Sequence, residues 1–260
     1  MNPRIDVLLD GPVAHVTIAN KARRNALTVA LWDELKAAFE RLAADEPLRC
    51  IVVRGDGNAF CAGADMSEFE HVRSTHAQVE RFHEEHVLGA LTAIAECPVP
   101  VVAAIGGVCM GGGLEIAAVC DIRIASESAL FGAPVGKLGF PLAFAETQAV
   151  FRLVGPAVLS ELLLEGRVFD AAQALAKGLV SRVVADEDLA AEAEATTARI
   201  CETGPLAARE HKRQIRRLMR DASPVSREER MAVYSFADTE DYRIGYRAFL
   251  EKKKPRFVGR

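Results

Sequence analysis

The stretch that decides the fold is CPVPVVAAIGGVCMGGGLEIAAVCDIRIAS, residues 97–126. Its apolar runs and glycines predict a strand, a glycine-rich loop, a helix and a second strand, in that order. Three consecutive glycines, 111–113, stand just before Glu115, although glycine weakens helices and strands because its backbone loses the most entropy on folding. A tight turn followed by a glutamate that suits the helix dipole would explain this pattern without any chemistry.

The glycine-rich loop also suits a chemical role. Without Cβ atoms, a ligand oxygen can approach the free N–H groups of the first helical turn, which makes half of an oxyanion hole. The loop lacks the Lys-Ser/Thr ending of a phosphate-binding loop and the G-x-G-x-x-G spacing of a dinucleotide-binding fold. A second N–H donor is expected in NAFCAGADMSEF, residues 58–69, where small residues again follow a strand.

The rest of the chain predicts an α/β fold. A hairpin is expected to turn at Asp10-Gly11, Thr28 is expected to cap a helix, and RCIVVRG is predicted to be a short buried strand. From about residue 147 the chain is predicted to be mostly helical, with glycines ending the helices. We expect an α/β core over residues 1–195 and a helical C-terminal region over residues 196–260.

Composition and charge limit the classes of function. The 260 residues are 50% hydrophobic and carry a formal net charge of −4, which gives no general electrostatic attraction to nucleic acid or anionic lipid. The first residues do not resemble a signal peptide, and the apolar runs are too short to cross a bilayer. We therefore expect a cytoplasmic, soluble protein that binds neither nucleic acid nor membrane. The six cysteines form no C-x-x-C pair and are expected to be buried free thiols, and no metal site is predicted.

Four of the six histidines lie between two predicted strands, in a polar segment whose second half is predicted to be helical. HEEH, residues 83–86, differs from the H-E-x-x-H spacing that places two imidazoles on one face of a helix to bind zinc. The segment is therefore expected to carry its histidines on a solvent-exposed surface. They are His71, His76, His83 and His86.

A basic segment, REHKRQIRRLMRD at residues 209–221, is typical of a helix that binds nucleic acid or membrane. However, it contains no interleaved aromatic residues and belongs to an acidic protein. We therefore expect an exposed basic face, with Ile215, Leu218 and Met219 turned toward the protein.

The two glycine-containing segments, FCAGADMSEF and residues 97–126, resemble the enoyl-CoA hydratase/isomerase (crotonase) family. The resemblance continues in order along almost the whole chain, through RRNAL, FGAPVGKLG, LLLEGRVFDAAQALAKGLVSRVV and AFLEKKKPRF. It implies a spiral of ββα units with a helical C-terminal trimerisation region, assembled as a homotrimer or a dimer of trimers. It also implies an acyl-CoA substrate, no cofactor apart from the coenzyme A of that thioester, and a role in fatty acid metabolism.

The resemblance implies roles for particular residues. The backbone N–H groups of Ala64 and Gly112 would hold the thioester oxygen and stabilise an enolate, with Glu115 as the acid/base. Phe249 and Lys252 match a C-terminal pair that contacts coenzyme A, commonly at a subunit boundary. The full set implied to bind substrate or coenzyme A is Phe60, Ala62, Ala64, Asp65, Met66, Gly111, Gly112, Val135, Phe140, Leu142, Phe249 and Lys252.

The chain departs from the hydratase pattern in and after FGAPVGKLG. Hydratases of the family hold water between two glutamates, but the second position is Val135 here, and valine can neither orient water nor transfer a proton. Glu146 is the one new carboxylate in the altered loop that follows. It either replaces the missing partner of Glu115 or stabilises a helix N-terminus. Three apolar residues of the loop are expected to make this wall of the pocket bulkier: Phe140, Leu142 and Phe144.

The sequence favours an enoyl-CoA hydratase-like lyase that works through a stabilised enolate. An enoyl-CoA double-bond isomerase is an alternative, because one glutamate beside an oxyanion hole suffices for a proton shift. However, isomerases of the family carry their glutamate nearer to Val135. An acyl-CoA-binding member with weak or no hydratase activity is a further alternative, which the loss of the second glutamate favours and the retained Glu115 disfavours.

Overall fold

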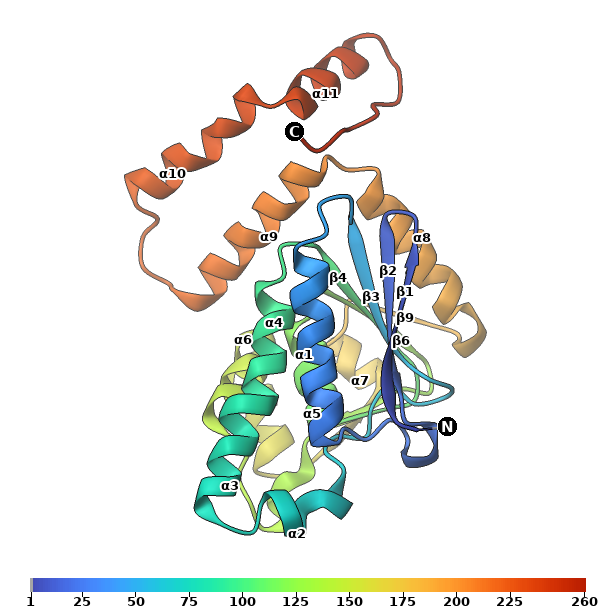
Figure 1. The fold of residues 1–260 in the computed structure, drawn as a ribbon, viewed down its shortest axis with the longest axis vertical. Coiled ribbons are helices and arrows are strands. Elements are labelled where there is room, and N and C mark those ends of the chain that lie inside the picture. The colour runs from blue at the N-terminus through green and yellow to red at the C-terminus, as the bar shows by residue number, and fades with distance from the viewer. Residues whose placement is uncertain (1) are drawn as a thin grey trace.

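The computed structural model describes residues 2–260 and has a six-stranded sheet with helices on both of its faces (Figure 1). The strand order is β1-β2-β3-β4-β6-β9, in which β1 and β2 pair antiparallel and all other neighbours are parallel. The predicted hairpin is confirmed, since Asp10 pairs with Val13 across the turn. The strands are β1 (Arg4–Asp10), β2 (Val13–Ala19), β3 (Cys50–Gly55), β4 (Val101–Ile105), β6 (Ile122–Ser126) and β9 (Arg182–Val184).

A second, three-stranded sheet anchors the glycine-rich segment. It consists of β5 (Val108–Met110), β7 (Leu130–Gly132) and β8 (Val168–Asp170), with β5 parallel to β7 and β7 antiparallel to β8. The sequence predicted a loop where β5 lies. Three residues between glycines give no periodicity of their own, and β5 forms because β7 pairs with it.

Helices α1 (Val29–Ala43) and α4 (Leu88–Glu96) lie side by side on one face of the larger sheet (Figure 1). The predicted cap of α1 is confirmed, because Thr28 Oγ1 accepts a hydrogen bond from Leu31 N at 3.2 Å. The apolar stripe of α1 is buried and joins the main hydrophobic core.

Glycines were predicted to end three helices of the core. Gly178, with a φ of +75°, directly follows the C-cap of α7, whereas Gly166 lies beyond the C-cap of α6. Helix α6 begins at Phe144 and is kinked at Gly155, whose φ of +71° interrupts the helical backbone. Helix α8 lies on the other face of the sheet, where Ala193 packs with Val52 and Ala104, and the expected boundary at residue 195 falls within this helix. The helices are α2 (Phe69–Val72), α3 (His76–Arg81), a π-helix (Phe82–Val87), α5 (Gly112–Val119), α6 (Phe144–Leu163), α7 (Ala171–Ala176) and α8 (Leu189–Cys201).

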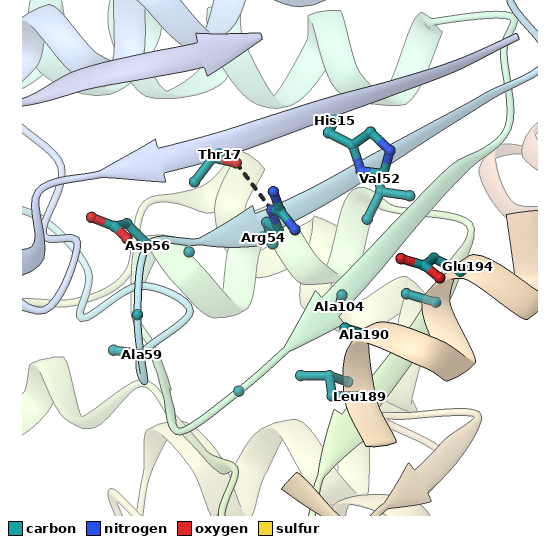
Figure 2. A pocket seen from close by; sticks show the side chains of 14 residues that line it. His15, Thr17, Val52, Arg54, Asp56, Ala59, Ala104, Leu189, Ala190 and Glu194 are labelled. Carbon is teal, nitrogen blue, oxygen red and sulfur yellow. Dashed lines mark hydrogen bonds between the residues drawn. The ribbon is translucent and has the colours of Figure 1, made fainter. Parts of the chain in front are cut away.

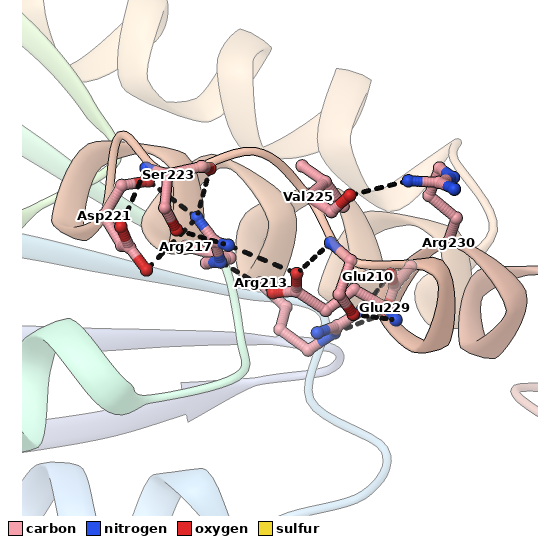
Figure 3. Close-up of polar contacts among 9 residues, drawn as sticks. Glu210, Arg213, Arg217, Asp221, Ser223, Val225, Glu229 and Arg230 are labelled. Atoms are coloured by element: carbon pink, nitrogen blue, oxygen red, sulfur yellow. Dashed lines mark hydrogen bonds and ion pairs between the residues drawn. The ribbon is translucent and has the colours of Figure 1, made fainter.

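The C-terminal region consists of α9 (Pro205–Arg220), α10 (Arg227–Val233) and α11 (Glu240–Leu250). Helix α9 lies next to the core, and α10 and α11 lie beyond it (Figure 1). Arg217 on α9 pairs with Glu229 on α10 at 2.6 Å and so joins the two helices (Figure 3). No helix formed by residues 2–260 is both long enough and apolar enough to cross a membrane.

The predicted orientation of α9 is wrong. Ile215 and Leu218 are 57% and 58% exposed, and Met219 is exposed as well. The basic side faces the core instead, where Lys212 Nζ lies 2.7 Å from Asp121 Oδ2 and donates to a main-chain carbonyl. The reason is that the core presents a carboxylate and carbonyl oxygens at this end, which bind the cationic side of the helix.

Candidate active site

Three glycines form the turn between β5 and α5, and each is needed for a physical reason. Gly111 has a φ of +48°, a left-handed conformation that residues with a Cβ rarely adopt. A Cβ on Gly112 would lie 2.7 Å from Trp32 Cζ2, and one on Gly113 would lie 2.5 Å from Cys61 O. The triplet therefore provides one unusual backbone conformation and two close approaches.

The loop around Ala64 lies against this turn. Cys61 is joined to β5 by two backbone hydrogen bonds of 2.9 Å. Leu27 donates to Gly63 O and accepts from Asp65 N, both at 2.8 Å. Because Leu27 uses the groups of residues 63 and 65, the N–H of Ala64 points to the opposite side of the extended segment. Ala64 lines a cavity on that side.

The N–H of Gly112 borders the same cavity. It opens helix α5, where the first N–H groups have no acceptor within the helix. A Cβ on Gly63 would lie 3.6 Å from Gly112 N, so the two loops are in van der Waals contact. Ala64 and Gly112, which come from distant parts of the chain, therefore line one cavity.

The cavity has a volume of about 350 Å³ and a mostly apolar wall. Its titratable side chains are Arg73, His83, Glu115 and Glu146. Of the predicted residues, those that line it are Ala62, Ala64, Met66, Gly111, Gly112, Glu115, Val135, Phe140, Leu142 and Glu146.

Glu115 lies one turn into α5 and is buried at the cavity. Burial raises the pKa of its carboxyl group well above the ordinary value, because the charged form loses its hydration. The carboxylate of Glu146 raises this pKa further, and the Arg73 guanidinium opposes the rise. The protonated form of Glu115 is thus favoured, and the group is suited to donating a proton inside the cavity.

Glu146 is buried at the start of α6, and both of its oxygens are engaged. Oε1 lies 2.5 Å from His83 Nδ1, and Oε2 accepts a hydrogen bond from Ala143 N at 3.3 Å. Glu146 therefore stabilises the N-terminus of α6 and also lies in the cavity, near enough to Glu115 to raise its pKa. The structure confirms the contact at the helix N-terminus, and the exchange of Glu146 for the missing partner of Glu115 stays a prediction.

The prediction that all four histidines are solvent-exposed is wrong for two of them. His71 and His76 are exposed, but only 13% of the His83 side chain is accessible, because the π-helix turns it toward Glu146. His86 is also partly buried and lies 2.6 Å from Asp33 Oδ1, outside the cavity lining. The carboxylate partners come from α6 and α1, so the local HEEH pattern did not reveal them.

Five residues expected at the pocket lie elsewhere. Phe60 is fully buried in the hydrophobic core, and Asp65 caps a short 3₁₀ turn while pairing with an arginine at 2.7 Å. Phe144 is 86% exposed, so the expectation that it narrows the pocket wall is wrong, because the first turn of α6 directs it away. Phe249 is 82% exposed and Lys252 follows α11, both in the C-terminal region of the chain.

Several lining residues were missed because they come from scattered segments. Trp32 is one of them, and its indole Nε1–H is buried without a hydrogen-bond partner within residues 2–260. A sequence pattern reveals a helical face but does not show which cavity that face borders. The missed residues include Trp32, Phe69, Arg73, Phe82, His83, Val87, Pro134, Leu138 and Pro141.

A second cavity, of about 310 Å³, lies between the other face of the sheet and α8 (Figure 2). Its charged residues include Arg54, Asp56 and Glu194, all solvent-exposed, and Arg54 Nε donates to Thr17 Oγ1 at 3.2 Å. By contrast, the carboxyl groups of Glu115 and Glu146 are buried in the first cavity. The cavity with the buried glutamates is therefore the candidate active site.

Two convergent main-chain N–H groups beside a buried carboxyl group are suited to enzymes that stabilise a developing oxyanion while moving a proton. The chain belongs to the enoyl-CoA hydratase/isomerase family, whose model matches residues 10–260, and it is an enzyme of that family with the crotonase fold.

The similarity extends over whole chains. A probable enoyl-CoA hydratase of Mycobacterium bovis is 36% identical over 252 residues, which are 96% of each protein. A crystal structure described as an enoyl-CoA hydratase/carnithine racemase from Magnetospirillum magneticum is 42% identical, with a TM-score of 0.96 over 100% of this chain and 97% of that one. A hydratase/isomerase family protein from Hyphomonas neptunium is 34% identical, with a TM-score of 0.92 over 98% of each chain.

Proposed function

We propose that the protein is an enoyl-CoA hydratase-like lyase that adds water to a 2-enoyl-CoA thioester. The thioester carbonyl oxygen accepts hydrogen bonds from the N–H groups of Ala64 and Gly112. The observation that carries the proposal is the buried Glu115 in the same cavity as these donors, with a second proton-transfer unit, Glu146 and His83, in its wall.

Hydration in this site divides the two proton transfers between two units. The water oxygen forms a bond to C3, the π electrons of the C2=C3 bond move toward the thioester, and the enolate oxygen is held by the two N–H groups. His83, oriented by Glu146, accepts the proton that the water loses. The protonated Glu115 then gives its proton to C2, and exchange with solvent restores both groups.

The pair of His83 and Glu146 takes the role of the second glutamate of the hydratases, whose position is occupied by Val135 in this chain. Glu146 fixes the orientation of the His83 ring through the 2.5 Å contact with Nδ1, which leaves Nε2 as the ring nitrogen available to accept a proton. Val135 lies in the cavity wall but has no group that transfers a proton.

The test is turnover of 2-enoyl- and 3-enoyl-CoA thioesters by purified variants. We expect Glu115→Gln to lower kcat/KM for hydration by about 100- to 10,000-fold, and His83→Gln and Glu146→Gln by about 100-fold each. The double variant of His83 and Glu146 should be little worse than either single one, because the two act as a unit. His86→Gln is the matched control, since His86 also pairs with a carboxylate but lies outside the cavity.

Other outcomes would identify the alternatives. Unchanged hydration in His83→Gln and Glu146→Gln would remove this pair from the mechanism. Turnover of 3-enoyl but not 2-enoyl thioesters would favour an isomerase that uses Glu115 alone. Binding of acetoacetyl-CoA without turnover of any enoyl thioester would favour an acyl-CoA-binding member.

We also propose that the protein assembles as a homotrimer or a dimer of trimers through its C-terminal helices, and that it acts in the cytoplasm on acyl-CoA thioesters. The exposed apolar residues of this region support a subunit interface, and they include Ile215, Leu218, Tyr242, Tyr246, Phe249 and Leu250. In such an assembly Phe249 and Lys252 would contact the coenzyme A bound by a neighbouring subunit. Light scattering during size-exclusion chromatography tests the subunit number, and a monomer would contradict this proposal.

A further inference from the structure

Arg73 lies in the active-site cavity and is held there by three aromatic rings. Its Cζ atom is 4.4 Å from the centroid of Phe69, 4.6 Å from that of Phe140 and 5.1 Å from that of Phe82. Stacked rings cover the faces of a guanidinium group and leave the N–H groups along its edge free. The three rings come from three separate segments, so tertiary packing fixes the position of this cation.

No carboxylate pairs directly with Arg73 in the described part of the chain. Within residues 2–260 its side chain forms no ion pair or hydrogen bond, although Glu115 and Glu146 are near enough to act on its charge. Glu146 uses its two oxygens for His83 and the start of α6, and burial favours the neutral form of Glu115. The N–H groups of Arg73 thus have no acceptor within the described part of the chain.

An anion that binds to the free edge of Arg73 would belong to the acyl part of the substrate. Arg73 lines the same cavity as Glu115, which protonates C2 of the acyl chain in the proposed function. The phosphates of coenzyme A are separated from the thioester by the whole pantetheine arm. An anionic group close to the reacting carbons must therefore be carried by the acyl chain.

We propose that Arg73 binds a carboxylate at the far end of the acyl chain, so that the substrates are coenzyme A monothioesters of dicarboxylic acids. The inference rests on the proposed function for the position of the thioester. A guanidinium edge binds a carboxylate through two parallel hydrogen bonds, which fixes the direction of the acyl chain as well as its end. An uncharged acyl chain would remove water from the guanidinium without supplying an acceptor, and this costs binding energy.

The test compares saturated thioesters that cannot be hydrated. Glutaryl-CoA carries a terminal carboxylate, and 5-methylhexanoyl-CoA carries an isopropyl group of the same shape in its place. The pair is titrated calorimetrically, together with the corresponding pairs that are one and two carbons longer. We expect the wild type to bind the carboxylated member of the best-fitting pair about 10- to 100-fold more tightly.

Arg73→Met should abolish this preference, and Arg73→Lys, which keeps the charge without the planar fork, should reduce it. Arg81→Met is the matched control and should keep the preference, because Arg81 is exposed on the neighbouring helix and faces Glu85. Thermal unfolding of each variant verifies that it is folded.

Equal affinity of the wild type for both members at every length would overturn the proposal. A preference for the carboxylated thioester that persists in Arg73→Met would also overturn it. An equal loss of affinity for both thioesters in Arg73→Met would overturn it as well, because Arg73 would then only support the cavity wall. Because the thioesters are not turned over, these results are independent of hydration. A failure of the proposed function appears instead as absent turnover of enoyl thioesters while the binding preference persists.

Discussion

Replacing Gly113 by alanine tests whether the two donor loops are held at the contact the structure describes. The new Cβ would lie 2.5 Å from Cys61 O and 2.8 Å from Cys61 Cβ. Ordinary contacts between carbon and oxygen begin near about 3.3 Å, so the loops must separate by roughly 0.8 Å. The atom displaced is backbone, and it also accepts the hydrogen bond from Met110 N.

The expected cost has two parts. Overpacking at a fixed backbone atom should lower the free energy of unfolding by about 1–3 kcal/mol, less the gain of about 1 kcal/mol that alanine brings to a helix. Separating the loops also moves the N–H groups of Ala64 and Gly112 apart. A misplacement of about 1 Å in a catalytic site lowers turnover on the order of 100-fold.

The assay is urea unfolding together with kcat/KM for crotonyl-CoA. Gly245→Ala is the matched control, because Gly245 also lies in a helix, α11, and a Cβ there would meet Phe257 at an ordinary 3.5 Å. We expect the control to be active and equally or more stable. If Gly113→Ala retained both the turnover and the stability of the wild type, the close contact of the two loops would be refuted.

Three further outcomes are expected. Burial raises the pKa of folded Glu115 above its unfolded value near 4.5. The contribution of Glu115 to the free energy of unfolding is therefore fully present below about pH 4.5 and is lost as the pH rises through the folded pKa. The unfolding free energy of the wild type, measured against that of Glu115→Gln, should therefore fall with rising pH, and a constant difference would contradict this. Asp121→Ala should lower the free energy of unfolding in urea by about 3 kcal/mol, because Lys212 and Arg216 lose the carboxylate that they share. The control Asp56→Ala, at an exposed position, should leave the free energy of unfolding nearly unchanged. Burial raises the pKa of the Cys61 thiol to about 12, so iodoacetamide at pH 8 should not alkylate it until the protein is unfolded. Mass spectrometry measures the labelling. Rapid labelling of the native protein would show that the Cys61 thiol is accessible to solvent.

Local features of the chain were predictable from the sequence because they depend on neighbouring residues. Thr28 caps α1 through a hydrogen bond to a residue three positions away, and the turn at Asp10-Gly11 joins strands that pair directly. The six free cysteines are confirmed, five of them buried and Cys201 partly so. In each case the signal is a residue type at a fixed short spacing.

The candidate site was predictable only in part. The glycines and Glu115 were recognisable because a positive φ favours glycine, and because the glutamate follows these glycines directly at the start of a predicted helix. The short contact of His83 with Glu146 joins residues 63 positions apart, and the setting of Arg73 depends on rings from three segments. No local spacing encodes such contacts.

The orientation of whole elements was also decided by tertiary packing. Helix α9 has a basic and an apolar side, and its pattern alone indicates the apolar side as the buried one. The core decided otherwise, because Asp121 and nearby carbonyl oxygens bind Lys212 and Arg216.

The sequence by itself determined the strand, the glycine turn and the helix that bring Gly112 and Glu115 together, because these lie within a few residues of one another. Only the tertiary structure decided that His83 and Arg73 share the cavity with them, and that Glu146 contacts His83 there. The physical reason is that periodicity specifies which face of an element is buried, whereas the partner that buries it depends on how the whole chain packs.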